Sequence, residues 1–237
     1  RAIVLPAEDR FARGCKPTLR VGRGQPDAPF AEVHREDAHD AKEFTGSKGL
    51  RNPQRNAAVR IAAMKNVVIL GAARTPVGSF LGKLSSLPAH ALGSAAIKGA
   101  LAQAGVSGDK VEAVILGNVL QAGQGQAPAR QASLGAGIPN SVPCVTVHKV
   151  CGSGMRAAMD VGNAIIAGEY DLAVAGGMES MSNAPYLLER ARTGYRMGNG
   201  TLVDSMIKDG LWDPYKDVHM GNCAEMCVAK YSFTREE

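Results

Sequence analysis

The sequence predicts an α/β fold in which a parallel sheet is covered by helices on both faces. Short apolar runs rich in β-branched residues recur after residue 64, and segments with helical spacing separate them. Strands buried on both faces read as near-continuous apolar runs, and strand–helix alternation favours parallel pairing through right-handed crossovers. The expected strands cover residues 67–70, 111–116, 142–147 and 172–175.

Three helices are expected between these strands. An alanine-rich helix spans residues 89–104 and ends at Gly105, and a shorter one spans 127–134. The third runs from about Met155 to Ala167 and repeats apolar residues at helical spacing.

Residues 1–63 differ from the rest of the chain. They show no sustained period, are broken by proline and glycine, and hold 12 of the 27 Lys and Arg and 8 of the 22 Asp and Glu. They lack the apolar core of a signal peptide. They also do not fit a mitochondrial presequence, which should be poor in acidic residues. We therefore expect a disordered or non-native leader over 1–63, an α/β half over 64–182, and a further, truncated segment over 183–237.

Charge and composition limit the partners. Most of the net charge of +5 belongs to the leader, and only 5% of residues are aromatic, so we expect no nucleic-acid surface. We expect no membrane partner. We also expect no metal site, because the cysteines lack zinc-site spacing. The five irregularly spaced cysteines fit a reducing compartment, and the cytoplasm is the expected location.

Cys151 is the leading candidate for catalysis. It follows the expected strand over 142–147 and precedes the expected third helix, with Gly152 and Gly154 in the turn. A helix N-terminus favours a thiolate, and glycines let a substrate approach the backbone closely. The pattern therefore predicts a nucleophile at Cys151 with substrate beside Gly152.

The same residues allow two other interpretations. Most buried cysteines are inert packing residues. Gly152, Gly154 and Ala157 also match a dinucleotide-binding fingerprint, with Glu179 about where a ribose-binding acid is wanted. The local pattern alone leaves the nucleophile and the dinucleotide site almost equally favoured.

The wider sequence resembles the thiolases. Residues 146–157 (TVHKVCGSGMRA) resemble the nucleophile segment of that family, and three further segments match it in order: 73–78 (ARTPVG), 117–131 (GNVLQAG and QAPARQ within it) and 175–182 (AGGMESMS). The resemblance implies a five-layered αβαβα sandwich of two similar halves, of which this chain holds the first.

The activity implied by the resemblance is exchange between acyl-CoA molecules. Two acetyl-CoA would condense to acetoacetyl-CoA and CoA, or the reverse, through a Cys151 acyl-enzyme, with CoA thioesters as substrates and no cofactor. The family's second catalytic cysteine and its Gly-His-Pro histidine belong to the other half, so this chain alone should be inactive. Alternatives are a longer-chain 3-ketoacyl-CoA thiolase of fatty-acid degradation, a related condensing or lipid-binding protein and, more distantly, an NAD-binding oxidoreductase.

The segment 183–237 resembles the start of the inserted loop domain of the thiolases. The resemblance implies a role in CoA binding and in homodimer or homotetramer contacts of the full-length protein. Residues 204–221 resemble short-chain biosynthetic thiolases, which places His219 and Met220 beside the acyl and pantetheine pocket. A helix carrying Cys223 and Cys227 should follow.

His148 lies three residues before Cys151 and departs from the family, which usually has Asn at this position. Alternation along a strand would point the two side chains to opposite faces, although the turn weakens that geometry. We expect a packing or subunit-contact residue here rather than the catalytic base.

Overall fold

The computed structural model describes residues 2–6 and 66–236, and a five-stranded sheet in the order β2-β1-β5-β3-β4 organises them. All neighbouring strands of this sheet run parallel. The strands are β1 (Ala2–Pro6), β2 (Val68–Ala73), β3 (Ala113–Gly117), β4 (Cys144–Val147) and β5 (Leu172–Gly177). The predicted α/β class is confirmed.

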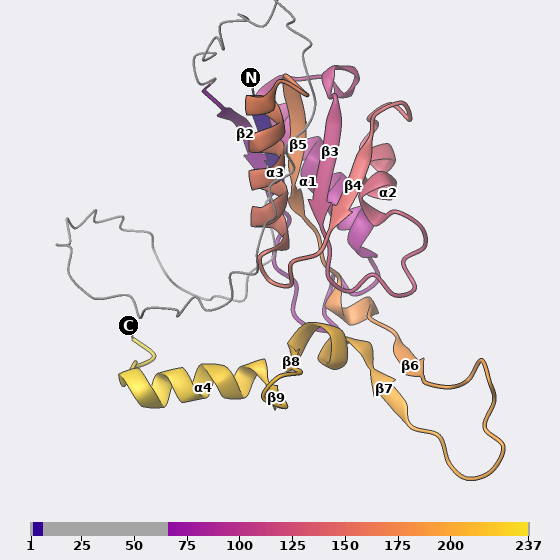
Figure 1. Ribbon diagram of the computed structural model, residues 1–237. Helices are drawn as coiled ribbons and strands as arrows, with labels where there is room; N and C mark the ends of the chain where they lie inside the picture. The colour runs from indigo at the N-terminus through magenta and orange to yellow at the C-terminus, as the bar shows by residue number, and fades with distance from the viewer. Residues whose placement is uncertain (1, 7–65, 237) are drawn as a thin grey trace, which may run out of the picture. The chain divides into compact units, whose positions relative to one another are not determined.

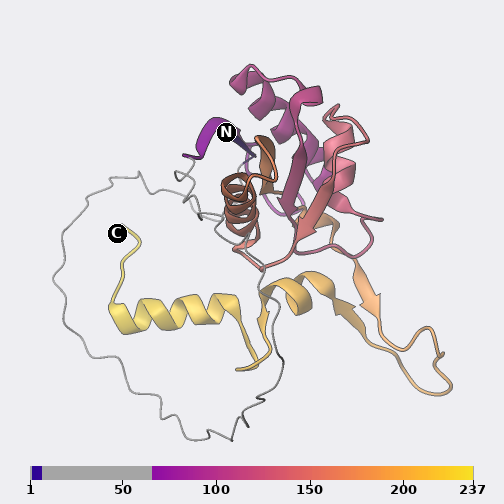
Figure 2. The same cartoon turned by 45° about the horizontal axis from the view of Figure 1, so that its top comes forward.

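Helices cover both faces of the sheet, as Figure 1 shows. On one face, α1 (Ala89–Ala104) and α2 (Pro128–Gly135) share a core with Val114 and Leu116 of β3. On the other, α3 (Ser153–Ala167) packs on Ala113 of β3 and on β5. Successive residues of a strand point to opposite faces, so β3 supplies both cores. In Figure 2, α3 lies on the opposite side of the strands from α1 and α2.

Strand β1 corrects the expectation for the leader. Ala2–Pro6 lies between β2 and β5, with Ile3 paired to both Ile69 and Ala173. This short apolar run suits a strand, and a place between two strands supplies partners for its backbone on both sides. The expectation of a disordered leader is therefore wrong for these residues, and residues 7–63 lie outside the described part of the chain.

The segment after β5 contains short regular pieces. Two antiparallel ribbons form, β6 (Tyr186–Leu188) with β7 (Leu202–Asp204) and β8 (Trp212–Asp213) with β9 (Val218–His219). A π-helix (Met206–Leu211) joins the ribbons. Helix α4 (Met220–Tyr231) follows and carries both expected cysteines.

An ion pair ties the π-helix to the end of β6. Lys208 donates to the Glu189 carboxylate, and this hydrogen bond lowers the pKa of Glu189 and raises the pKa of Lys208.

Within the described ranges, no helix combines the length and apolar character needed to span a bilayer.

Candidate active site

Three turns meet at one edge of the sheet because β3, β4 and β5 run parallel and end together. Asn118 follows β3, the turn 148–152 follows β4, and Glu179 lies just beyond β5. The carboxyl edge of a parallel sheet is the usual place for a ligand in α/β proteins. The predicted nucleophile therefore stands where such a fold places chemistry.

Cys151 is an exposed free thiol that lies just before Gly152, the N-cap residue of α3. Gly152 is the N-cap, and α3 begins at Ser153, whose side chain is fully buried. The Ser153 Oγ accepts a hydrogen bond from the Lys149 N–H at 2.8 Å and donates one to the Val150 carbonyl at 2.6 Å. The helix N-terminus expected at Cys151 is confirmed, and Ser153 anchors its turn.

Two glycines near the turn differ in what they require. A Cβ on Gly117 would lie 2.6 Å from both the carbonyl carbon and the Cβ of Ser153, so β3 approaches the start of α3 too closely for any side chain. A Cβ on Gly152 would meet only the Lys149 carbonyl at 3.4 Å, an ordinary contact. Packing within the described chain therefore requires Gly117 but does not require Gly152, whose proximity to substrate stays a prediction.

Glu179 holds the loop that follows β3. Its carboxylate accepts hydrogen bonds from the Asn118 side chain at 2.8 Å, the Val119 N–H at 2.9 Å and the Leu120 N–H at 3.0 Å. The buried Asn118 amide also donates to the Met178 carbonyl at 3.1 Å and accepts from Gln124 at 3.1 Å. Glu179 thus ties the end of β5 to the loop after β3.

This geometry disfavours a dinucleotide site. A ribose-binding acid should follow the strand next to the glycine turn, but β3 separates β4 from β5. The Glu179 carboxylate is, moreover, engaged by the loop after β3 rather than directed to a ligand.

His219 and Met220 lie on the segment after the sheet. His219 caps α4 by accepting the Gly221 N–H on its Nδ1 at 2.9 Å, and Met220 is partly exposed at the first position of that helix. In the described part of the chain, no hydrogen bond joins either residue to Cys151. Their role beside a substrate stays a prediction.

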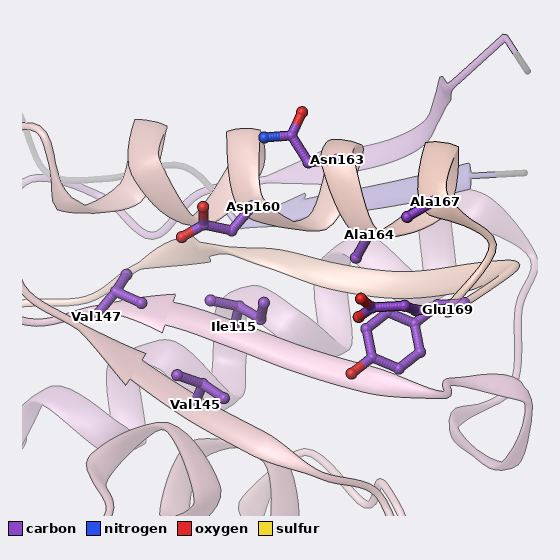
Figure 3. A pocket seen from close by; sticks show the side chains of 9 residues that line it. Ile115, Val145, Val147, Asp160, Asn163, Ala164, Ala167 and Glu169 are labelled. Carbon is purple, nitrogen blue, oxygen red and sulfur yellow. The ribbon is translucent and has the colours of Figure 1, made fainter. Parts of the chain in front are cut away.

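One cavity lies apart from Cys151, which is not among the residues that line it. It measures about 400 Å³ and lies beside α3 against the sheet, as Figure 3 shows. Ile115, Val145 and Val147 of the strands form its floor, and Asp160 and Asn163 of α3 border it. It marks a part of the sheet face that α3 leaves uncovered.

In the described ranges, no group of three or more His, Cys, Asp or Glu side chains could hold a metal ion.

The sequence predicts Cys151 as a site residue but does not predict the residues that hold the turns around it. The sequence pattern suggests Glu179 only as a possible ribose ligand and indicates no role for Asn118 or Ser153. A signal was present, because Asn118 and Glu179 each closely follow an apolar strand and parallel strands end at a shared edge. Polar residues at such ends can be expected to meet.

Comparison with known proteins identifies the family. The model of the family described as Thiolase, N-terminal domain matches residues 67–237. Acetyl-CoA acetyltransferase 2 of Arabidopsis thaliana is 60% identical over 173 residues, covering 73% of this chain and 43% of that protein. Mitochondrial acetyl-CoA acetyltransferase of Bos taurus is 55% identical over 174 residues, covering 73% and 41%. The chain thus spans about two fifths of these relatives.

A solved structure agrees with these relatives. The crystal structure of Acat5 thiolase from Ascaris suum in complex with coenzyme A superposes with a TM-score of 0.65 and 45% sequence identity. The match covers 70% of this chain and 43% of that one.

The names of the animal relatives correct the expected location. The matching proteins of Xenopus laevis, Bos taurus and Homo sapiens are all named mitochondrial. The cytoplasmic expectation, which rested on cysteine usage, is therefore wrong. A mitochondrial matrix is also reducing enough to keep thiols free, so cysteine count could not separate the two compartments.

The fold and the family match thus agree on the segment around Cys151. Strands β2, β3, β4 and β5, the glycine turn and α3 all lie within the matched residues. The chain belongs to the thiolase family and carries its N-terminal domain.

Proposed function

We propose that this chain is the nucleophile-bearing part of an acetyl-CoA acetyltransferase. Such an enzyme condenses two acetyl-CoA to acetoacetyl-CoA and CoA, or cleaves acetoacetyl-CoA in reverse. The observation that carries the proposal is the exposed Cys151 thiol at the N-terminus of a 15-residue helix. The named relatives support acetyl groups over the longer chains of fatty-acid degradation.

The first step forms an acyl-enzyme. The Cys151 thiolate attacks the carbonyl carbon of acetyl-CoA, the bond from that carbon to the CoA sulfur breaks, and CoA leaves as the thiol after taking up a proton. An acyl-enzyme divides one difficult exchange into two easier steps. We assign the Cys151 backbone N–H to the developing oxyanion, because preorganised donors stabilise that charge strongly.

The second step forms the carbon–carbon bond. A base removes a proton from the α-carbon of a second acetyl-CoA, and the resulting carbanion attacks the acyl carbon. The bond to Cys151 sulfur then breaks, and the thiolate is regenerated with acetoacetyl-CoA as product. The family resemblance assigns the base to a cysteine of the C-terminal half.

The proposal includes CoA as the bound group and a larger assembly. The coenzyme A complex of the Ascaris suum thiolase supports CoA thioesters as substrates. We propose that His219, Met220 and Gly152 contact them. We also propose that the complete protein is a homodimer or homotetramer, and that its second half covers the open sheet face beside α3.

Thiolysis by the complete protein that the gene encodes tests this function. With acetoacetyl-CoA and CoA, the protein should form two acetyl-CoA per turnover, and Cys151→Ser should slow this by at least about 10³-fold. Cys144→Ser is the matched control, because Cys144 lies within β4 and donates weakly to the Val142 carbonyl. Equal activity of the Cys151→Ser protein would refute the proposal.

A further inference from the structure

Val150, the residue before Cys151, has an unusual backbone conformation. Its φ is +43°, in the left-handed region that β-branched residues rarely adopt. Sparsely populated conformations persist only where the surroundings fix them, and they gather at functional sites. The contacts that hold Val150 therefore control where Cys151 stands.

Side chains on both sides of Val150 fix this conformation. The His148 Nδ1 accepts a hydrogen bond from the Val150 N–H at 3.1 Å. On the helix side, the Val150 carbonyl accepts from the Ser153 Oγ at 2.6 Å and from the Ser153 N–H at 3.1 Å. Both backbone polar groups of Val150 are thus engaged, one by a residue before the turn and one by a residue after it.

We propose that His148 is a positioning residue that holds the nucleophile turn rather than the catalytic base. Its Nδ1 binds the N–H two residues ahead, which is the bond that Asn and Asp side chains make in Asx turns. Since Nδ1 accepts, the imidazole carries its proton on Nε2. In the described part of the chain, no hydrogen bond joins His148 to Cys151. This inference rests on the proposed role of Cys151 as nucleophile.

Two substitutions at residue 148 separate positioning from imidazole chemistry. His148→Asn keeps an acceptor for the Val150 N–H, whereas His148→Ala removes it. We expect His148→Ala to slow alkylation of Cys151 by iodoacetamide about fivefold, as for the loss of one hydrogen bond, and His148→Asn to stay within about twofold of the unchanged protein. Peptide mass mapping of the folded, complete protein measures the rate at Cys151 itself.

A substitution at residue 150 tests the mechanism directly. Glycine adopts left-handed conformations freely, so Val150→Gly should make the turn less dependent on His148. In the His148→Ala background, Val150→Gly should recover most of the lost alkylation rate. If His148→Ala slowed the reaction by removing a catalytic base, Val150→Gly would not recover the rate. His90→Ala is the control, because in the described chain the buried His90 Nδ1 has no hydrogen-bond partner.

The outcomes are decisive in either direction. Loss in His148→Ala, retention in His148→Asn and recovery by Val150→Gly support positioning; equal loss in both single variants, or no loss in either, overturns it. If His148→Ala does not fold, His148→Gln replaces it, because its acceptor lies one carbon too far out and should slow the reaction. If alkylation follows this pattern but acetoacetyl-CoA is not cleaved, the proposed function fails and the positioning role stands.

Discussion

At the scale of single residues, the site depends on how closely β3 and α3 approach. Gly117 touches Ser153, which in turn holds the backbone on both sides of Val150. A displacement at Gly117 would therefore pass directly to the turn that carries Cys151.

Gly117→Ala should be strongly destabilising. The added Cβ meets Ser153 at 2.6 Å, where backbone must move, so we expect the free energy of unfolding to fall by about 3 kcal/mol. Chemical denaturation of the complete protein measures this. Gly152→Ala is the matched control and should cost under about 1 kcal/mol, since its Cβ meets only an ordinary contact. A larger KM for acetoacetyl-CoA in the Gly152→Ala protein would support the predicted closeness of substrate.

The sequence predicts a nucleophile at Cys151 but not the residues that support its turn. A strand, a glycine turn and a helical repeat around Cys151 are local patterns, so its place could be predicted. The role of His148 could not, because it depends on the φ of Val150, which no neighbouring residue type reveals. Alternation along a strand does not apply once the backbone has turned.

At the scale of elements, Glu179 joins β5 to the loop after β3. It accepts from one side-chain and two backbone donors, in a region that is partly buried. A donor left without an acceptor in such a place costs the free energy of its desolvation as well as that of the lost hydrogen bond.

Glu179→Ala should lower the free energy of unfolding by about 3 kcal/mol, because three N–H donors lose a charged acceptor. The same denaturation experiment measures it. Glu225→Ala, the same change at an exposed position of α4, should change it by less than about 0.5 kcal/mol. If the two variants were equally stable, the three hydrogen bonds would contribute nothing to holding the loop.

The elements themselves were largely predictable, whereas their order in the sheet was not. Apolar runs marked the strands, although β4 begins at Cys144, after Pro143, which has no N–H for the ladder. The insertion of β1 between β2 and β5 pairs residues that are far apart in the chain. Local patterns carry no information on such pairing, so they do not predict the strand at residues 2–6.

At the scale of the whole molecule, α3 and the sheet face beside it expose apolar side chains to solvent. Met155, Met159 and Ile166 of α3 are each about half exposed, and the cavity of about 400 Å³ lies beside the same helix. A five-layered thiolase would cover this face with its second half.

Ile166→Ala tests that arrangement. In the complete protein, we expect a fall of about 2 to 3 kcal/mol in the free energy of unfolding, as for a buried side chain, although Ile166 is 47% exposed in this chain. Leu134→Ala on α2, where Leu134 is 44% exposed, is the matched control and should cost less than about 1 kcal/mol. Similar small losses in both would mean that the α3 face stays open to solvent.

Peptide mass spectrometry after brief exposure of the complete protein to acetyl-CoA can detect the acyl group that Cys151 is proposed to carry. One acetyl group should appear on the peptide containing Cys151, should be lost on addition of CoA and should be absent from the Cys151→Ser protein. An acetyl group on another cysteine, or none on Cys151 while acetoacetyl-CoA is still cleaved, would contradict it.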